Sequence, residues 1–178
     1  MKFTAPAPLS LILTLLCACT DVVWAKDAST VISGMDNLRQ SVDSAHSVFE
    51  SYDGGWLKSL ELGRAVWDVY SSTKSARGHW DSAPPFDSHD DVADILATYH
   101  AMRSSISDAM TLAGSKGSVY DKSGIRLMVM GMMQMFENER NEFQNSARAK
   151  IPESFHDDIA GPVANLKTEF QNAMKALA

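Results

Sequence analysis

Apolar side chains recur in alternating steps of four and three residues along three long stretches of this chain. Between residues 29 and 52 the stripe consists of Val31, Met35, Leu38, Val42, Ala45, Phe49 and Tyr52. Between residues 92 and 113 it consists of Val92, Ile95, Tyr99, Met102, Ile106, Ala109 and Ala113, and from residue 155 onward of Phe155, Ile159, Val163, Leu166, Phe170, Ala173 and Leu177. This spacing lines one face of an α-helix that packs in a bundle. Because no stretch shows the two-residue alternation of a strand, the sequence predicts an all-α fold.

Two further helices complete the predicted bundle of about five amphipathic helices. The first helix ends at Asp53-Gly54-Gly55, because glycine commonly follows the last helical residue. A second helix is expected over about residues 56–77. Residues 78–88 form the longest predicted connection, since Pro84-Pro85 forbids a helix through it. A fourth helix is expected over residues 124–149, and an earlier start at Val119 is the alternative.

The ends of the third and last helices carry recognisable signals. Ser88 with Asp91 three residues later resembles a capping box at the start of the third helix. Pro152 stands at a position that the first turn of a helix tolerates. Inside the last helix, Gly161-Pro162 predicts a kink or a break, because an interior proline removes a backbone hydrogen bond and clashes with the preceding turn.

The first 25 residues have the pattern of a signal peptide. Lys2 is followed by the apolar run Leu9–Cys19, and Val23-Trp24-Ala25 suits signal peptidase. We therefore expect residues 1–25 to be removed and residues 26–178 to form a single secreted helical domain. The alternative is a bacterial lipoprotein site with Cys19 lipidated. The run is too short to span a bilayer, so an integral membrane protein is not expected.

The cysteine content and the net charge argue against several classes of function. Both cysteines, Cys17 and Cys19, lie in the predicted signal peptide, so the mature chain has no disulfide, Cys-ligated metal or Cys nucleophile. The formal net charge of the whole chain is −6. A mildly acidic protein gains nothing from phosphate backbones, which argues against nucleic-acid binding and against charge-driven docking on anionic lipid.

The sequence contains no motif typical of a catalytic or metal-binding site. The five histidines are His46, His79, His89, His100 and His156, and none forms a metal-binding pair at helical spacing. The clusters His89-Asp90-Asp91 and His156-Asp157-Asp158 lie at predicted helix starts, where acidic residues favour the helix dipole. Glu137 with Glu139 is read as a solvated face, although Glu139 also falls on the apolar stripe and is either a polar group in a pocket or an edge residue reaching water. No enzymatic activity and no cofactor are predicted.

The methionine-rich segment, residues 127–135, contains five of the ten methionines of the chain. Methionine is unbranched and polarizable, so such a cluster either fills a core or forms an adaptable apolar binding surface. As candidate ligand-lining residues on this and neighbouring helices we take Leu127, Met128, Met132, Met135, Phe136, Phe143, Ile95, Tyr99 and Phe170. Trp56, Trp80 and Phe86 lie near predicted connections and either form an exposed apolar patch or cover the bundle ends.

The order of these features resembles the fungal hydrophobic surface-binding protein A family, which includes the antigenic cell wall mannoproteins. The features are a first helix ending in Tyr52-Asp53-Gly54-Gly55, a Ser/Asp-rich start with Asp91 in the third helix, and Ala149-Lys150-Ile151-Pro152 before a last amphipathic helix. The resemblance implies a secreted, non-catalytic protein that adsorbs to hydrophobic surfaces or holds a lipid such as a fatty acid between its helices. It also implies secreted hydrolases as further partners. The alternative is a secreted structural or effector protein that recognises other proteins at the cell wall or host interface.

Overall fold

The computed structural model describes residues 27–178. The predicted signal peptide and the alternative lipidation site at Cys19 lie outside the described residues. The helices are α1 (Ala28–Ser51), α2 (Trp56–Ser82), α3 (His89–Ser115), α4 (Gly117–Ser123), α5 (Arg126–Arg148) and α6 (His156–Leu177), with a 3-10 turn η2 (Glu153–Phe155) before α6. No strand occurs in these residues, which confirms the prediction of an all-α bundle.

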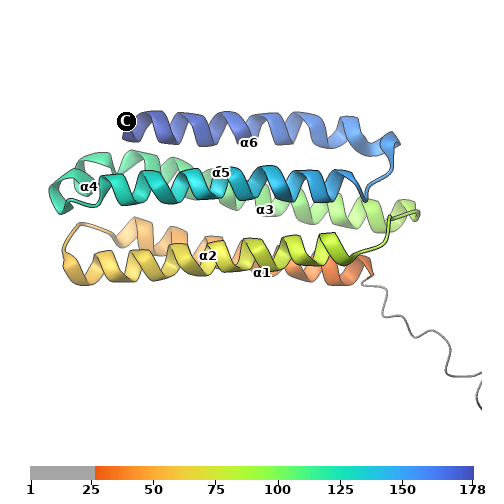
Figure 1. Ribbon diagram of the computed structural model, residues 1–178, viewed down its shortest axis with the longest axis horizontal. Helices are drawn as coiled ribbons and strands as arrows, with labels where there is room; N and C mark the ends of the chain where they lie inside the picture. Colours follow the sequence, from red (N-terminus) through yellow and green to blue (C-terminus); the bar gives the residue numbers. More distant parts are fainter. Residues whose placement is uncertain (1–26) are drawn as a thin grey trace, which may run out of the picture.

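The five long helices run side by side along the bundle (Figure 1), and their contacts close into a ring around a common core. Helix α1 packs against α2 and α3, α3 packs against α6, α6 packs against α5, and α5 packs against α2. Helices α2 and α5 begin at the same end of the bundle, beside the short α4 (Figure 1). The apolar stripes read from the sequence therefore face one shared interior.

Local signals in the sequence account for the helix boundaries. The Asp27 carboxylate accepts a hydrogen bond from the Thr30 backbone N–H at 3.1 Å, and the Ser88 hydroxyl accepts one from the Asp91 N–H at 3.3 Å. The turn between α1 and α2 requires positive φ at Gly54 (105°) and Gly55 (93°), a region that glycine enters at little cost. The predicted cap at Ser88 and the glycine stop after the first helix are thus confirmed.

Two predicted boundaries are wrong, the end of the second helix and the early start of the fourth at Val119. Helix α2 continues to Ser82, because residues 78–82 precede Pro84-Pro85 and only these prolines prevent helical geometry. A separate α4 precedes the methionine-rich helix, with Gly124 in the left-handed conformation (φ 69°) between them. Helix α6 continues through Pro162, so of the predicted kink or break the break does not occur.

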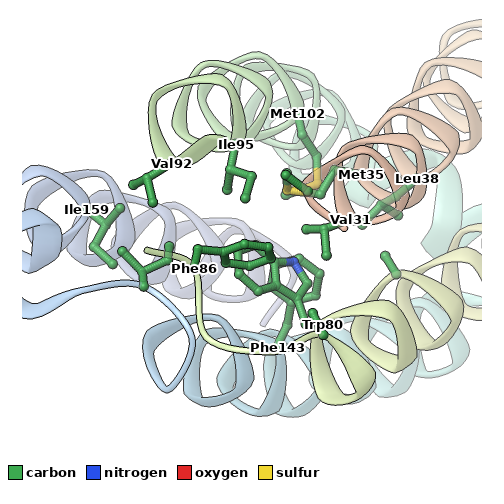
Figure 2. Close-up of a cluster of buried hydrophobic side chains, with 14 of the residues drawn as sticks. Val31, Met35, Leu38, Trp80, Phe86, Val92, Ile95, Met102, Phe143 and Ile159 are labelled. Carbon is green, nitrogen blue, oxygen red and sulfur yellow. The ribbon is translucent and has the colours of Figure 1, made fainter. Parts of the chain in front are cut away.

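The core divides into two clusters of buried side chains. The Trp80 cluster contains Trp80, Phe86 and Phe143 with apolar residues of α1 and α3, and its three rings meet edge to face with centroids 5.8 and 6.1 Å apart (Figure 2). The Met133 cluster lies toward the α4 end and contains Met110, Met133, Leu166 and Phe170, with Met130, Met132 and Met174 packed against it. The alternative that Trp80 and Phe86 form an exposed apolar patch is wrong, since they are 1% and 5% exposed and belong to the core.

Candidate ligand-binding site

An elongated apolar cavity of about 140 Å³ lies inside the ring of helices. Side chains from all five long helices line it, and the lining runs from the Trp80 cluster into the Met133 cluster. Along α3 the lining extends from Ile95 to Ala113, which corresponds to ~27 Å at ~1.5 Å rise per residue. One leaflet of a bilayer's hydrocarbon core, about one acyl chain, is ~15 Å thick. The lining therefore spans more than the depth of one acyl chain in a bilayer.

The cavity is narrow for its length. An engineered cavity of ~150 Å³ lined by apolar side chains accommodates benzene. A complete acyl chain therefore requires side chains to repack or helices to separate. Met102, Met110, Met132 and Met133 line the cavity and suit such repacking, because methionine changes shape at low strain.

The structure brings together six of the nine predicted lining residues. They come from three helices and are Ile95, Tyr99, Met132, Phe136, Phe143 and Phe170. Leu127, Met128 and Met135 do not line the cavity and are exposed, Leu127 at 83%. Helix α5 carries apolar residues on two faces, and packing against α2 and α6 turns only one of them inward.

Further lining residues were not among those predicted. They include Leu38 and Val42 of α1, Val66 and Trp80 of α2, and Val129 and Met133 of α5. The signal for most of them was present, since Leu38 and Val42 belong to the four-three stripe of the first helix. The stripes identify the inner face of each helix, and a cavity inside a ring is lined by all inner faces.

Few polar groups reach the cavity. The Thr73 hydroxyl donates to the Val69 carbonyl at 2.8 Å and so is satisfied within its own helix. Burial raises the pKa of the Tyr99 phenol, which keeps it neutral. Trp80 Nε1 is buried and has no hydrogen-bond partner in residues 27–178. Arg140 and Gln144, both on α5, are the remaining polar residues of the lining.

Two ion pairs cross the seams of the ring. Arg77 Nη1 of α2 lies 3.2 Å from Glu139 Oε2 of α5, and Arg103 Nη2 of α3 lies 3.0 Å from Glu169 Oε1 of α6. The Glu139 side chain is only 14% exposed, so the interpretation of an edge residue reaching water is wrong. Glu139 Oε2 lies close to Arg77 but forms no hydrogen bond with it, and Glu139 does not line the cavity. Glu139 is mostly removed from water, and a cation from the neighbouring helix accompanies it.

An outer apolar face covers the first halves of α2 and α5. It consists of Trp56, Leu57, Leu60 and Trp67 on α2 and Leu127, Met128 and Met135 on α5, all of them exposed. The two helices pack against each other and begin at the same end of the bundle (Figure 1). Trp67 contacts the Tyr70 ring (centroids 5.6 Å apart), which in turn contacts the cavity residue Phe136 at 6.3 Å. Of the three aromatics near predicted connections, only Trp56 is exposed, at 72%.

Both histidine clusters lie at the start of a helix, and each histidine ring has a contact within the fold. His89 begins α3 and packs against the Phe155 ring at 5.0 Å, and His156 begins α6 with its Nε2 3.0 Å from the Ile151 carbonyl oxygen. Both acidic pairs lie in first turns, as predicted. Within residues 27–178, no group of three or more His, Cys, Asp or Glu side chains is placed to hold a metal ion. None of the described helices is long and apolar enough to cross a membrane.

The fold and cavity define a helical-bundle protein with an internal apolar chamber. The family model of hydrophobic surface binding protein A (HsbA) matches residues 28–149, and the chain belongs to this family. This confirms the resemblance drawn from the sequence. No curated protein matches the chain in a sequence search.

Several solved structures share the fold. AfMP4p in complex with palmitic acid is 14% identical, with a TM-score of 0.82 over 85% of this chain and 100% of that chain. Ligand-binding domain 1 of the Penicillium marneffei MP1 protein, complexed with arachidonic acids, is 13% identical, with a TM-score of 0.78 over 85% and 99%. Domain 2 of the same protein, complexed with multiple arachidonic acids, is 15% identical, with a TM-score of 0.79 over 85% and 96%. At these identities the likeness concerns the fold.

Proposed function

We propose that this protein is a secreted, non-catalytic lipid-binding protein that holds one fatty acyl chain inside the ring of helices. The observation that carries the proposal is the apolar cavity, which continues through both core clusters and is lined by all five long helices. The fatty acids in the structures of the same fold support this choice of ligand. The predicted signal peptide supports secretion.

Binding exchanges one set of apolar contacts for another. Separating the helices exposes apolar surface to water, which costs ~25 cal/mol of free energy per Å². Contacts with the acyl chain recover a similar free energy per Å². The exchange is therefore nearly balanced, and a ligand with more affinity for the open form shifts the population toward it. Methionines that repack at low strain reduce the cost of opening.

The proposal is tested by native mass spectrometry on the chain secreted from a eukaryotic host, followed by lipid extraction and titration with a fluorescent fatty acid. We expect a co-purifying acyl species that the probe displaces at about one per chain. A bare protein mass together with no saturable binding of the probe would exclude the internal lipid site.

The outer apolar face favours a second function, adsorption to hydrophobic surfaces. Seven large apolar side chains are exposed on two adjacent helices, and contiguous exposed apolar patches mark interaction sites. Adsorption of the protein to alkyl-coated beads, measured with and without bound fatty acid, tests this function separately. Depletion from solution by alkyl beads but not by hydroxyl-coated beads is expected, and equal depletion by both would contradict it.

A further inference from the structure

A polar groove lies on the outside of the bundle between α5 and α6, directly beside the internal cavity. The groove measures about 380 Å³, and three of its residues, Arg140, Gln144 and Val163, also line the cavity. These shared residues form the wall between an apolar interior and a polar surface. The groove is thus a place where an amphiphile has access to both environments.

The groove is positively charged in an otherwise acidic protein. Its lining contains two cations, Arg140 and Lys167, and no carboxylate. Neither cation forms a salt bridge in the part of the chain that the structure describes, whereas Arg77 and Arg103, on the neighbouring α2–α5 and α3–α6 seams, are paired. With a net charge of −6 for the whole chain, this local pair of unneutralised cations favours an anion.

Arg140 is positioned to serve both sides of the wall. Its Cζ lies 6.0 Å from the centroid of the Phe170 ring, so the side chain packs on the cavity lining. One guanidinium nitrogen donates to the Asn141 side-chain oxygen at 2.8 Å, while Nε is buried without a hydrogen-bond partner among the described residues.

We propose that Arg140, assisted by Lys167, binds the carboxylate of a single-chain fatty acid at the α5–α6 groove while the acyl chain enters the cavity toward Val129. A carboxylate matches the forked donors of an arginine and forms strong charge-assisted hydrogen bonds with them. Val129 is the lining residue of α5 nearest to α4, and it precedes Arg140 by eleven residues. That distance is ~16 Å at ~1.5 Å rise per residue, close to the ~15 Å of one acyl chain.

This inference rests on the proposed lipid-binding function and adds selectivity for anionic head groups. It predicts that a fatty acid binds more tightly than the alcohol of the same chain length, because only the acid presents a carboxylate. A ligand held by apolar contacts alone would not show this difference.

The test compares hexadecanoate with hexadecanol, each displacing a fluorescent fatty acid from the full secreted protein at neutral pH. For Arg140→Gln we expect affinity for the acid to fall about tenfold or more, as for loss of a charged hydrogen bond, and affinity for the alcohol to stay within about twofold. Arg140→Lys should retain an intermediate affinity, because it keeps the charge and loses the fork. Arg148→Gln, an exposed arginine eight residues later on α5, is the matched control and should bind both ligands as the original protein does.

Lys167→Gln keeps the test independent of the core, since Lys167 is exposed and its replacement removes charge without altering packing. We expect it to weaken acid binding severalfold and to leave alcohol binding unchanged, with exposed Lys175→Gln as its control. Equal losses for acid and alcohol in Arg140→Gln would assign that residue a packing role and overturn the inference. Unchanged acid binding in both groove variants would also overturn it while leaving the lipid site intact. If the unsubstituted protein bound neither hexadecanoate nor hexadecanol, this result would instead refute the proposed function.

Discussion

The two halves of the bundle core differ in the contacts between their aromatic rings and in the partly buried side chains around them. The Trp80 cluster has three aromatic rings in edge-to-face contact, and its large side chains are almost fully buried (Figure 2). The Met133 cluster also buries three rings, Tyr52, Tyr120 and Phe170, but three further methionines pack partly buried against it, and the outer apolar face lies on the helices beside it. Rigid rings fix one arrangement, whereas methionine tolerates several. One half therefore secures the fold, and the other is suited to change shape around a ligand.

The largest expected effect is on stability and comes from the Trp80 cluster. Trp80→Ala should lower the free energy of unfolding by ~3–5 kcal/mol, because it removes a fully buried ring and leaves a cavity beside Phe86 and Phe143. The melting temperature should fall by about 10 °C for a domain of this size. Trp56→Ala on the same helix should change stability by no more than ~0.5 kcal/mol, since Trp56 is exposed. Similar losses from both variants, measured by urea unfolding, would contradict the core position of Trp80 and the surface position of Trp56.

In the Met133 half, the expected effect is on ligand binding. Phe136→Ser should reduce affinity for a fluorescent fatty acid by ~10- to 100-fold, because burial of a Phe side chain is worth ~1.5–3 kcal/mol. Helicity should change little, since Phe136 is only partly buried. Met135→Ser, one residue earlier and on the outer apolar face, should bind the probe normally. Equal loss of helicity and binding in Phe136→Ser would indicate that Phe136 is an ordinary core residue.

The outer apolar face gives a third comparison, between outside and inside of the same half. Replacing Trp56, Leu57 and Trp67 together by serine should weaken adsorption to alkyl beads by at least about tenfold, given the apolar area removed. Fatty-acid affinity and melting temperature should stay as they are, because none of the three residues lines the cavity. Parallel loss of adsorption and fatty-acid binding would mean that the two surfaces act as one site.

The smallest expected effect concerns buried tyrosines and high pH. Burial raises the pKa of the Tyr120 phenol, and the nearby Tyr52 adds to the rise; Tyr120 OH has no hydrogen-bond partner in residues 27–178. The unfolded chain ionises this phenol near pH ~10, so the stabilisation is present below that pH and is lost as the pH rises further. Tyr120→Phe should leave stability unchanged or slightly raised at neutral pH and make the alkaline loss shallower. Urea unfolding at neutral pH and above about pH 10 measures both, and an unaltered alkaline loss would contradict the assignment.

Much of the fold followed from the sequence because helix signals are local. The four-three stripes, the Gly54-Gly55 turn and the Ser88 cap depend on residues a few positions apart, and all three are found as predicted. The family resemblance rested on the same signals. The end of α2 at Ser82 and the separate α4 were missed. Proline and glycine show that a helix must end nearby, but they do not specify the residue at which it ends.

The sequence by itself determined the class of fold and the inner faces of α1, α3 and α6, since each of these helices has a single apolar stripe. Only the tertiary structure decided which of the two apolar faces of α2 and α5 is buried, so it alone separated Phe136 from Met135 and Trp80 from Trp56. It alone also brought Arg140 of α5 beside Lys167 of α6. The physical reason is that periodicity describes one helix at a time, whereas burial and cavities depend on how closely helices distant in sequence approach one another.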